Sequence, residues 1–301
     1  MPFRSTTPQD SQTLHPSDSQ PSATARYRLT IAYDGTGFHG WQKQEPATIV
    51  GNPALETDDA GRTVVRTVQH VVEQAVRHVV REHVNLQGAS RTDAGVHALA
   101  QTGAFTCAHD TPRPPDERLA LAINARLPGD VLVTRVVRTR GDFEPVTDCV
   151  SKGYRYTFDI GEQRPLFDRM RAYHVRYPLD IDRMQGGARA LVGTHDFEAF
   201  AAASHGREST VRTIHDCAVT RDGRRVHLDV SGDGFLYNMV RIIAGTLLEV
   251  GRGRMDSSDI AHALESRDRA HAGPTLAPHG LCLMWMRYPE DPERPTTEDP
   301  A

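Results

Sequence analysis

The sequence predicts an α+β protein made of two halves that meet near residues 140–150. Three observations lead to this fold class. Segments with the period-two alternation of strands are interspersed with segments of helical spacing. Turn signals separate many of them, which indicates hairpins rather than a regular alternation of strand and helix. The 301 residues can bury one large core or two modest ones.

The composition is that of an ordinary globular protein, with 38% hydrophobic and 25% charged residues. The sequence has no run of about 18 apolar residues, so we expect no membrane span. The first residues lack the apolar core of a cleaved secretion signal, and we therefore expect a cytoplasmic protein. The four cysteines are far apart and form no C-x-x-C pair, which argues against a disulfide framework and a zinc ribbon: Cys107, Cys149, Cys217 and Cys282.

The net charge of −4 argues only weakly against nucleic-acid binding, because local patches decide phosphate contact. Residues 287–301 are acidic, whereas residues 135–176 carry an excess of basic side chains. Lys43 and Lys152 are the only lysines, so almost all basic residues are Arg. Arg suits bidentate contacts with phosphates and bases. The charge pattern therefore leaves a nucleic-acid partner open.

The folded chain is expected to begin near Arg26. Residues 1–24 are rich in Ser, Thr, Pro and Gln without a hydrophobic period, which predicts a disordered tail. Apolar and polar residues then alternate up to Tyr33, as in a strand, and the glycine-rich residues 34–37 predict a turn. Residues 45–66 combine prolines, glycines and an acidic cluster, and we expect a long loop or insertion there.

Valines and alanines at helical spacing predict the first clear helix over residues 68–80. A strand, a loop and a second strand are expected over residues 88–107. The other predicted elements are helices at 116–126, 181–192, 239–248 and 256–265, strands at 130–138, 153–160, 171–177 and 281–288, and a hairpin over 219–230 that turns at residues 221–223. We therefore divide the chain into a tail (1–24), an N-terminal half (25–145), a C-terminal half (146–289) and a mobile acidic tail (290–301).

Residues 88–98 are the most unusual part of the sequence. They concentrate a cation, a hydroxyl, a carboxylate and an imidazole among small residues that let another molecule approach the backbone. One interpretation is an ordinary surface turn with an ion pair between Arg91 and Asp93. The functional interpretation is that Asp93 is a nucleophile or a base on a rigid loop. At this loop, His97 as the general base is the competing assignment.

Two further patterns are expected to be structural. His78 and His83, with Glu82 between them, fit neither orientation of the helical zinc motif. The glycine-rich residues 251–254 lack the spacing of a dinucleotide-binding loop and follow a helix. We therefore expect no metal site.

Residues 91–98, Arg-Thr-Asp-Ala-Gly-Val-His-Ala, resemble the signature of the TruA family of tRNA pseudouridine synthases. One octapeptide could match by chance, but the resemblance continues in the same order along nearly the whole folded chain. The further segments that resemble the family are residues 33–42, 66–69, 124–130, 154–156, 193–200, 210–214, 234–241 and 277–281.

The resemblance implies a specific reaction. The family converts uridine to pseudouridine in the anticodon stem-loop of tRNA, typically at tRNA positions 38, 39 and 40, without a cofactor or a metal. The reaction breaks the bond between N1 of uracil and C1′ of the ribose, turns the base over and rejoins it through C5. The family's catalytic Asp corresponds to Asp93 and is described as a nucleophile. Attack on the sugar, attack on the base and removal of a ribose proton all remain open.

The resemblance also implies the partners of Asp93. A carboxylate in a site that excludes water needs a paired cation, and the matching residue is Arg241; the alternative is an Arg that lies along a helix surface. Tyr154 corresponds to the family's active-site Tyr and would offer an aromatic face to the flipped uracil. Arg91 is expected to contact backbone phosphate or to order the loop. Tyr156 shares a strand face with Tyr154, and we expect it in the core.

The chain departs from the family pattern at three places. Ser90 stands where the family usually has Gly. Residues 143–146, Phe-Glu-Pro-Val, replace a stretch that usually carries a His or Asp and an Arg, which puts one substrate contact or ion pair in doubt. Residues 45–65 are longer and more acidic than usual, and a surface loop tolerates such an insertion.

By resemblance, the fold has two ferredoxin-like or RRM-like halves joined into a central, mostly antiparallel sheet with flanking helices. The resemblance also implies a homodimer that binds one tRNA across both subunits, selected by shape and phosphate contacts. Two other classes stay open: a catalytically idle tRNA-binding homologue, and a hydrolase that uses Asp93 to release free uracil. The presence of Asp93, Tyr154 and Arg241 favours the isomerase.

Overall fold

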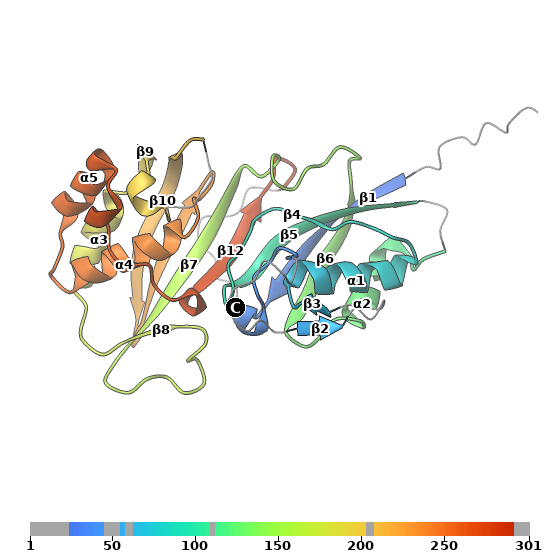
Figure 1. The fold of residues 1–301 in the computed structure, drawn as a ribbon, viewed down its shortest axis with the longest axis horizontal. Coiled ribbons are helices and arrows are strands. Elements are labelled where there is room, and N and C mark those ends of the chain that lie inside the picture. Colours follow the sequence, from blue (N-terminus) through green and yellow to red (C-terminus); the bar gives the residue numbers. More distant parts are fainter. Residues whose placement is uncertain (1–23, 45–54, 58–62, 109–111, 203–207, 292–301) are drawn as a thin grey trace, which may run out of the picture.

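In the computed structural model of the protein, one large mixed sheet is the central element. The structure describes residues 24–44, 55–57, 63–108, 112–202 and 208–291. Within these residues, ten strands form one mostly antiparallel sheet whose main path runs β6-β1-β5-β12-β7-β11-β10-β9 (Figure 1). β4 pairs with β5, and β8 with β7. The strands are β1 (Thr24–Tyr33), β4 (Gln87–Gly88), β5 (His97–Ala108), β6 (Val131–Thr139), β7 (Ser151–Ile160), β8 (Tyr173–Val175), β9 (Gly193–Asp196), β10 (Val211–Asp222), β11 (Arg225–Gly232) and β12 (Leu281–Arg287).

The helices form two groups, one at each end of the sheet (Figure 1). The first group, α1 (Val68–Val80) and α2 (Leu119–Asn124), lies with the strands β1, β5 and β6. The second group, α3 (Ile181–Arg189), α4 (Met239–Gly251) and α5 (Ser257–Ser266), lies with β7 and β9 to β11. The α+β class with a mostly antiparallel sheet and flanking helices is therefore confirmed.

One apolar core extends beneath both groups of helices. The strand registers place Tyr33, Ala98, Leu283, Tyr154 and Val230 next to one another across five neighbouring strands. All five side chains are buried in the same cluster. Because side chains alternate between the two faces of a strand, the residues between them lie on the opposite face.

The C-terminal strand β12 connects the two ends of the sheet. It pairs in parallel with β5 through Cys282 and Leu283, and antiparallel with β7 over most of its length. The sheet is therefore continuous between strands that are far apart in the sequence.

Several element boundaries differ from the sequence-based expectation. The hairpin of β10 and β11 begins at Val211 instead of residue 219, and residues 116–126 form a 3₁₀ turn followed by the short α2. β9 was not predicted; its four residues are strand because they pair with β10. Within the expected loop 45–66, the described residues include two short paired strands, β2 (Leu55–Thr57) and β3 (Thr63–Val65).

The expected tails and the acidic insertion lie largely outside the described residues, which exclude 1–23, 45–54, 58–62 and 292–301. Among the described helices, none combines the length and the apolar character that a membrane-spanning segment needs.

Candidate active site

The loop of residues 89–96, between β4 and β5, presents Asp93. The segment at Trp41 holds the backbone of this loop, because the carbonyl of Thr92 accepts a hydrogen bond from the Trp41 N–H at 3.0 Å. The Asp93 carbonyl in turn accepts from the Val96 N–H at 3.1 Å, which closes a tight turn. Gly40 has a φ of +84°, and a Cβ there would lie 2.6 Å from the Thr92 carbonyl oxygen. Only glycine permits this close approach, so the segment of Gly40 and Trp41 fixes the position of the loop that carries Asp93.

An ion pair joins Asp93 to Arg241. The Arg241 Nη1 lies 2.9 Å from the Asp93 Oδ2, and the two side chains are 16% and 27% exposed. The guanidinium also donates to the Asn238 Oδ1 at 2.6 Å and, through Nε, to the Leu276 carbonyl at 2.7 Å. Three fixed acceptors therefore hold the guanidinium in one orientation against the carboxylate.

Helix α4 places Arg241 at this point. The helix begins after Asn238, whose φ of 61° is left-handed, a conformation that Asn tolerates better than most residues. Almost all of the following residues are buried, and Arg241 is the charged residue of the first turn. A cation at a helix N-terminus opposes the helix dipole, and the ion pair with Asp93 offsets this cost.

Tyr154, on β7, lies beside this pair. Its side chain is buried, its ring packs edge-on against Phe235 with centroids 5.3 Å apart, and its hydroxyl lies 3.0 Å from the Ser90 hydroxyl. Burial raises the pKa of Tyr154 to about 12; the hydrogen bond with Ser90 lowers it and the negative charge of Asp93 raises it. Tyr154 is therefore a neutral aromatic group within electrostatic range of the carboxylate.

The structure brings together three of the four residues that the sequence singled out. Arg91 does not join them: its side chain is exposed and makes no hydrogen bond or ion pair with any residue that the structure describes. Tyr156 is fully buried and donates to the Ala277 carbonyl at 2.8 Å, as expected for a core residue. His97 accepts from the Gly35 N–H at 3.0 Å and contacts the Met170 carbonyl at 2.7 Å, so both ring nitrogens bind the protein itself.

Three residues of the site were not predicted. They are Ser90 and Asn238, which bind Tyr154 and Arg241 through their side chains, and Leu276, which binds Arg241 through its carbonyl. The only signal in the sequence was the position of Ser90 in the Asp93 loop and of Asn238 just before an apolar helix. A backbone carbonyl carries no sequence signal, so Leu276 could be found only in the structure.

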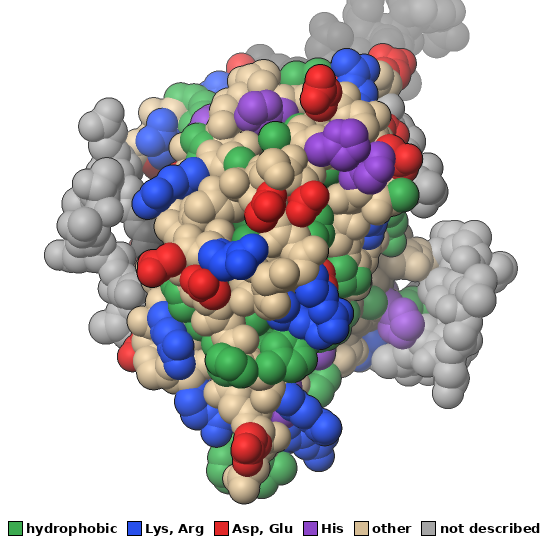
Figure 2. Space-filling model, turned by 90° about the vertical axis from the view of Figure 1, so that its left-hand side faces the viewer, with side chains coloured by type: hydrophobic (Ala, Val, Ile, Leu, Met, Phe, Trp, Pro, Cys, Tyr) green, Lys and Arg blue, Asp and Glu red, His purple; other side chains and the backbone are tan. Residues whose placement is uncertain are grey.

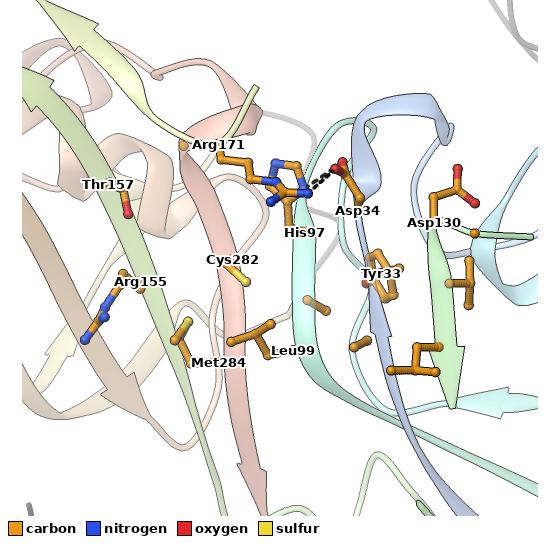
Figure 3. A pocket seen from close by; sticks show the side chains of 16 residues that line it. Tyr33, Asp34, His97, Leu99, Asp130, Arg155, Thr157, Arg171, Cys282 and Met284 are labelled. Atoms are coloured by element: carbon orange, nitrogen blue, oxygen red, sulfur yellow. Dashed lines mark hydrogen bonds and ion pairs between the residues drawn. The ribbon is translucent and has the colours of Figure 1, made fainter. Parts of the chain in front are cut away.

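A cavity of about 450 Å³ lies elsewhere and is lined by residues of β1, β5, β6, β7 and β12 (Figure 3). Its lining includes Arg155 and Thr157, which alternate along β7 with Tyr154 and Tyr156. Neither Asp93 nor Arg241 nor Tyr154 lines it. The cavity is therefore distinct from the site at Asp93.

Comparison with known proteins gives one consistent result. A family profile described as tRNA pseudouridine synthase matches residues 30–144 and 188–289. The chain is 39% identical to tRNA pseudouridine synthase A of Acetivibrio thermocellus over 87% of its own length and 98% of that protein. It is 40% identical to tRNA pseudouridine synthase A 2 of Clostridium tetani and 38% identical to tRNA pseudouridine synthase A of Geobacter sp., again over 87% of this chain and 98% of each relative.

Proposed function

Because the chain belongs to the tRNA pseudouridine synthase family, whose members are isomerases, we propose that it converts uridine to pseudouridine in the anticodon stem-loop of tRNA with Asp93 as the reacting carboxylate. The observation that carries this proposal is the contact between Asp93 and Arg241, with Tyr154 beside them. Residues from three distant parts of the chain converge there, which is typical of a catalytic constellation.

The isomerisation needs a group that reacts with the nucleotide while the glycosidic bond is broken. The bond between N1 and C1′ breaks, the bond between C5 and C1′ forms, C5 loses its proton and N1 gains one. The reacting group is the Asp93 carboxylate, acting as nucleophile. Arg241 keeps it oriented and balances its charge in the absence of water.

Two further residues contact the RNA in this proposal. The ring of Tyr154 stacks on the flipped uracil and offsets part of the cost of unstacking it. Arg91 contacts a backbone phosphate of the RNA, in keeping with its exposed guanidinium on the loop of Asp93, which pairs with no residue in the described part of the chain.

Tritium release from an unmodified tRNA transcript labelled at uridine C5 tests the reaction directly, because joining C5 to C1′ expels that hydrogen. Wild type is expected to release tritium, and Asp93→Asn is expected to lose at least about a thousandfold in kcat, as for other essential catalytic groups. Glu249→Gln is the matched control. Glu249 forms an ion pair of 2.8 Å with Arg252 at the other end of α4, and its loss should leave activity intact.

Two outcomes would contradict the proposal. Free uracil in the product would identify a hydrolase. No tritium release by wild type, together with intact tRNA binding, would identify a tRNA-binding protein without this activity.

We further propose that the sheet combines two ferredoxin-like halves, with the division near residue 145. The grouping of the helices supports this: α1 and α2 accompany β1, β5 and β6, whereas α3 to α5 accompany β7 and β9 to β11. Expressing residues 25–145 alone and recording its amide spectrum by NMR tests whether this half has its own fold.

We also propose that the protein is a homodimer formed through the face of the sheet that the cavity occupies. Leu99 and Leu132 are 47% and 50% exposed there, and both line the cavity together with Met284 (Figure 3). Exposed apolar patches of this kind mark interaction surfaces. A second copy is the occupant proposed here, because the family resemblance implies a homodimer.

Analytical ultracentrifugation of wild type, Leu132→Asp and Leu121→Asp tests the dimer. Wild type and Leu121→Asp should sediment as dimers and Leu132→Asp as a monomer, because Leu121 is equally apolar and 71% exposed but lies on α2. A monomeric wild type at micromolar concentration would contradict the proposal.

The location proposed for the protein is the cytoplasm, where its tRNA substrate is found. Cell fractionation with an epitope-tagged chain tests this.

A further inference from the structure

The loop that carries Asp93 is clamped at Ser90 by a buried glutamine. The Ser90 N–H donates to the Gln101 Oε1 at 3.2 Å, and the Gln101 Nε2 donates to the Ser90 carbonyl at 2.6 Å. The same Oε1 accepts from the Thr102 N–H at 3.1 Å, and Gln101 is fully buried on β5. One amide side chain thus satisfies both backbone groups of Ser90, which fixes the residue to the sheet.

The Ser90 side chain extends this clamp to Tyr154. The two hydroxyls are 3.0 Å apart, and Tyr154 is only 6% exposed, so its hydroxyl has little access to water. Phe235 packs against the Tyr154 ring, and Ser90 holds its tip. The contact with Phe235 and the bond with Ser90 therefore hold the Tyr154 side chain at two points.

Ser90 also precedes Asp93 by only three residues on the same loop. A bond from this loop to Tyr154 therefore fixes the aromatic ring relative to the carboxylate, across residues 64 positions apart in the chain. A glycine or alanine at this position would leave the Tyr154 hydroxyl without this partner.

We propose that Ser90 is a positioning residue for uridine isomerisation: clamped by Gln101, its hydroxyl holds the Tyr154 ring at a fixed orientation to Asp93. This inference rests on the proposed function. Ser90 does not touch the reacting atoms and acts only through Tyr154. Its contribution is to kcat, because the ring orientation matters once the uracil has entered the site, whereas tRNA is bound over a much larger surface.

A double-mutant cycle in the tritium-release assay tests the inference, with kcat and KM measured for Ser90→Ala, Tyr154→Phe and the double variant. Ser90→Ala should lower kcat by about 3- to 10-fold, the range expected for one neutral hydrogen bond, with KM for tRNA nearly unchanged. In the Tyr154→Phe background, Ser90→Ala should have no further effect, because the hydroxyl on which it acts is already absent. Ser90→Thr keeps a hydroxyl and should restore most of the activity.

Thr194→Ala is the matched control. It removes a hydroxyl-to-hydroxyl bond of 2.9 Å with Thr213, at the far end of the sheet, and should leave kcat unchanged. Melting temperatures of all variants separate a loss of stability from a loss of positioning.

The inference is overturned if Ser90→Ala keeps the wild-type kcat, or if its effect multiplies fully with that of Tyr154→Phe. Either result would leave the proposed function intact, since wild type would still release tritium. An inactive wild type would instead contradict the proposed function itself.

Discussion

Arg241 is held by three acceptors that belong to three different segments: the Asp93 carboxylate, the Asn238 side chain and the Leu276 carbonyl. This arrangement uses the planar fork of the guanidinium, which a lysine cannot reproduce. The orientation of Asp93 is therefore set before any RNA binds, and the cost of ordering the site has been met during folding.

Arg241→Lys should lower kcat by at least about tenfold while changing the melting temperature little, because the charge remains but two of the three bonds are lost. Steady-state tritium release and thermal unfolding together check this. Arg252→Lys is the control, since Arg252 pairs with Glu249 at the opposite end of α4. Wild-type kcat in Arg241→Lys would show that the fork geometry is not needed.

A second residue-scale prediction concerns Asp34, at the turn after β1. Burial raises the pKa of this carboxyl, but hydrogen bonds from Thr36 and Arg171 lower it, with a net value of about 2 against an ordinary 3.8. The folded state thus favours the ionised form. Its contribution to stability is complete above about pH 4 and is lost as the pH falls towards 2.

The measurement is the free energy of unfolding in urea for wild type and Asp34→Asn from pH 3 to 7. The difference between the two proteins should be constant above about pH 4 and shrink below it. Asp142→Asn, which removes an 82% exposed carboxylate, is the matched control for the loss of one negative charge. A difference that grows on acidification would have the wrong sign for this account.

At the scale of elements, α4 connects core packing to the site. The segment 273–276 crosses the helix so closely that a Cβ on Gly245 would lie 1.8 Å from the Pro274 carbonyl oxygen. A hydrogen bond from the Gly273 N–H to the Thr246 Oγ1 at 2.8 Å also joins this segment to the helix. The segment brings the Leu276 carbonyl to Arg241, so the site depends on a glycine in the middle of a helix.

Gly245→Ala should therefore destabilise the protein by about 1 to 3 kcal/mol and lower kcat as well, because the segment with Leu276 must move away. Gly186→Ala is the opposite case. It lies in α3 with nothing within 4 Å of the added Cβ, and should stabilise by about 0.5 to 1 kcal/mol without affecting activity. Chemical denaturation and the tritium assay on both variants check this contrast; a stable, fully active Gly245→Ala would refute it.

At the scale of the whole molecule, one continuous sheet joins the two groups of helices. The loop between β7 and β8 projects from the lower edge, with basic side chains on both sides of it (Figures 1 and 2). Its residue Arg171 returns to the body of the protein and pairs with Asp34 at 3.0 Å. Asp93 lies on the loop before β5, at the end of the sheet with β1 and β6. Tyr154 and Arg241 belong to the other end, with β7 and α4, and β12 lies between β5 and β7.

Leu283→Ala, in β12, tests whether the two ends of the sheet unfold together. Leu283 is fully buried between β5 and β7, so the substitution should cost about 2 to 5 kcal/mol. Calorimetry should still show one transition, shifted to lower temperature, because β12 pairs with strands of both halves and couples their unfolding in the whole chain. Leu121→Ala, at an exposed leucine, should change stability by less than about 0.5 kcal/mol. Two separated transitions in Leu283→Ala would show that the ends are independent.

The sequence by itself predicted the α+β class and most helices and strands, and its motifs singled out Asp93, Tyr154 and Arg241, which the structure brings together. Periodicity reports which side of an element is buried, and ordered motifs report a family, and both are local properties of the chain. The sequence did not predict β9, because its four residues are too few to show a period and are a strand only through pairing with β10.

Only the tertiary structure decided which groups support the site. The clamp of Gln101 on Ser90, the bond from Ser90 to Tyr154, and the Leu276 carbonyl at Arg241 all join segments that are distant in sequence or use backbone atoms. Such contacts have no period and no residue signature, because they depend on how strands and loops meet in space. Asp93 is thus identified by a local motif in its loop, whereas the orientation of its carboxylate is set by the fold around it.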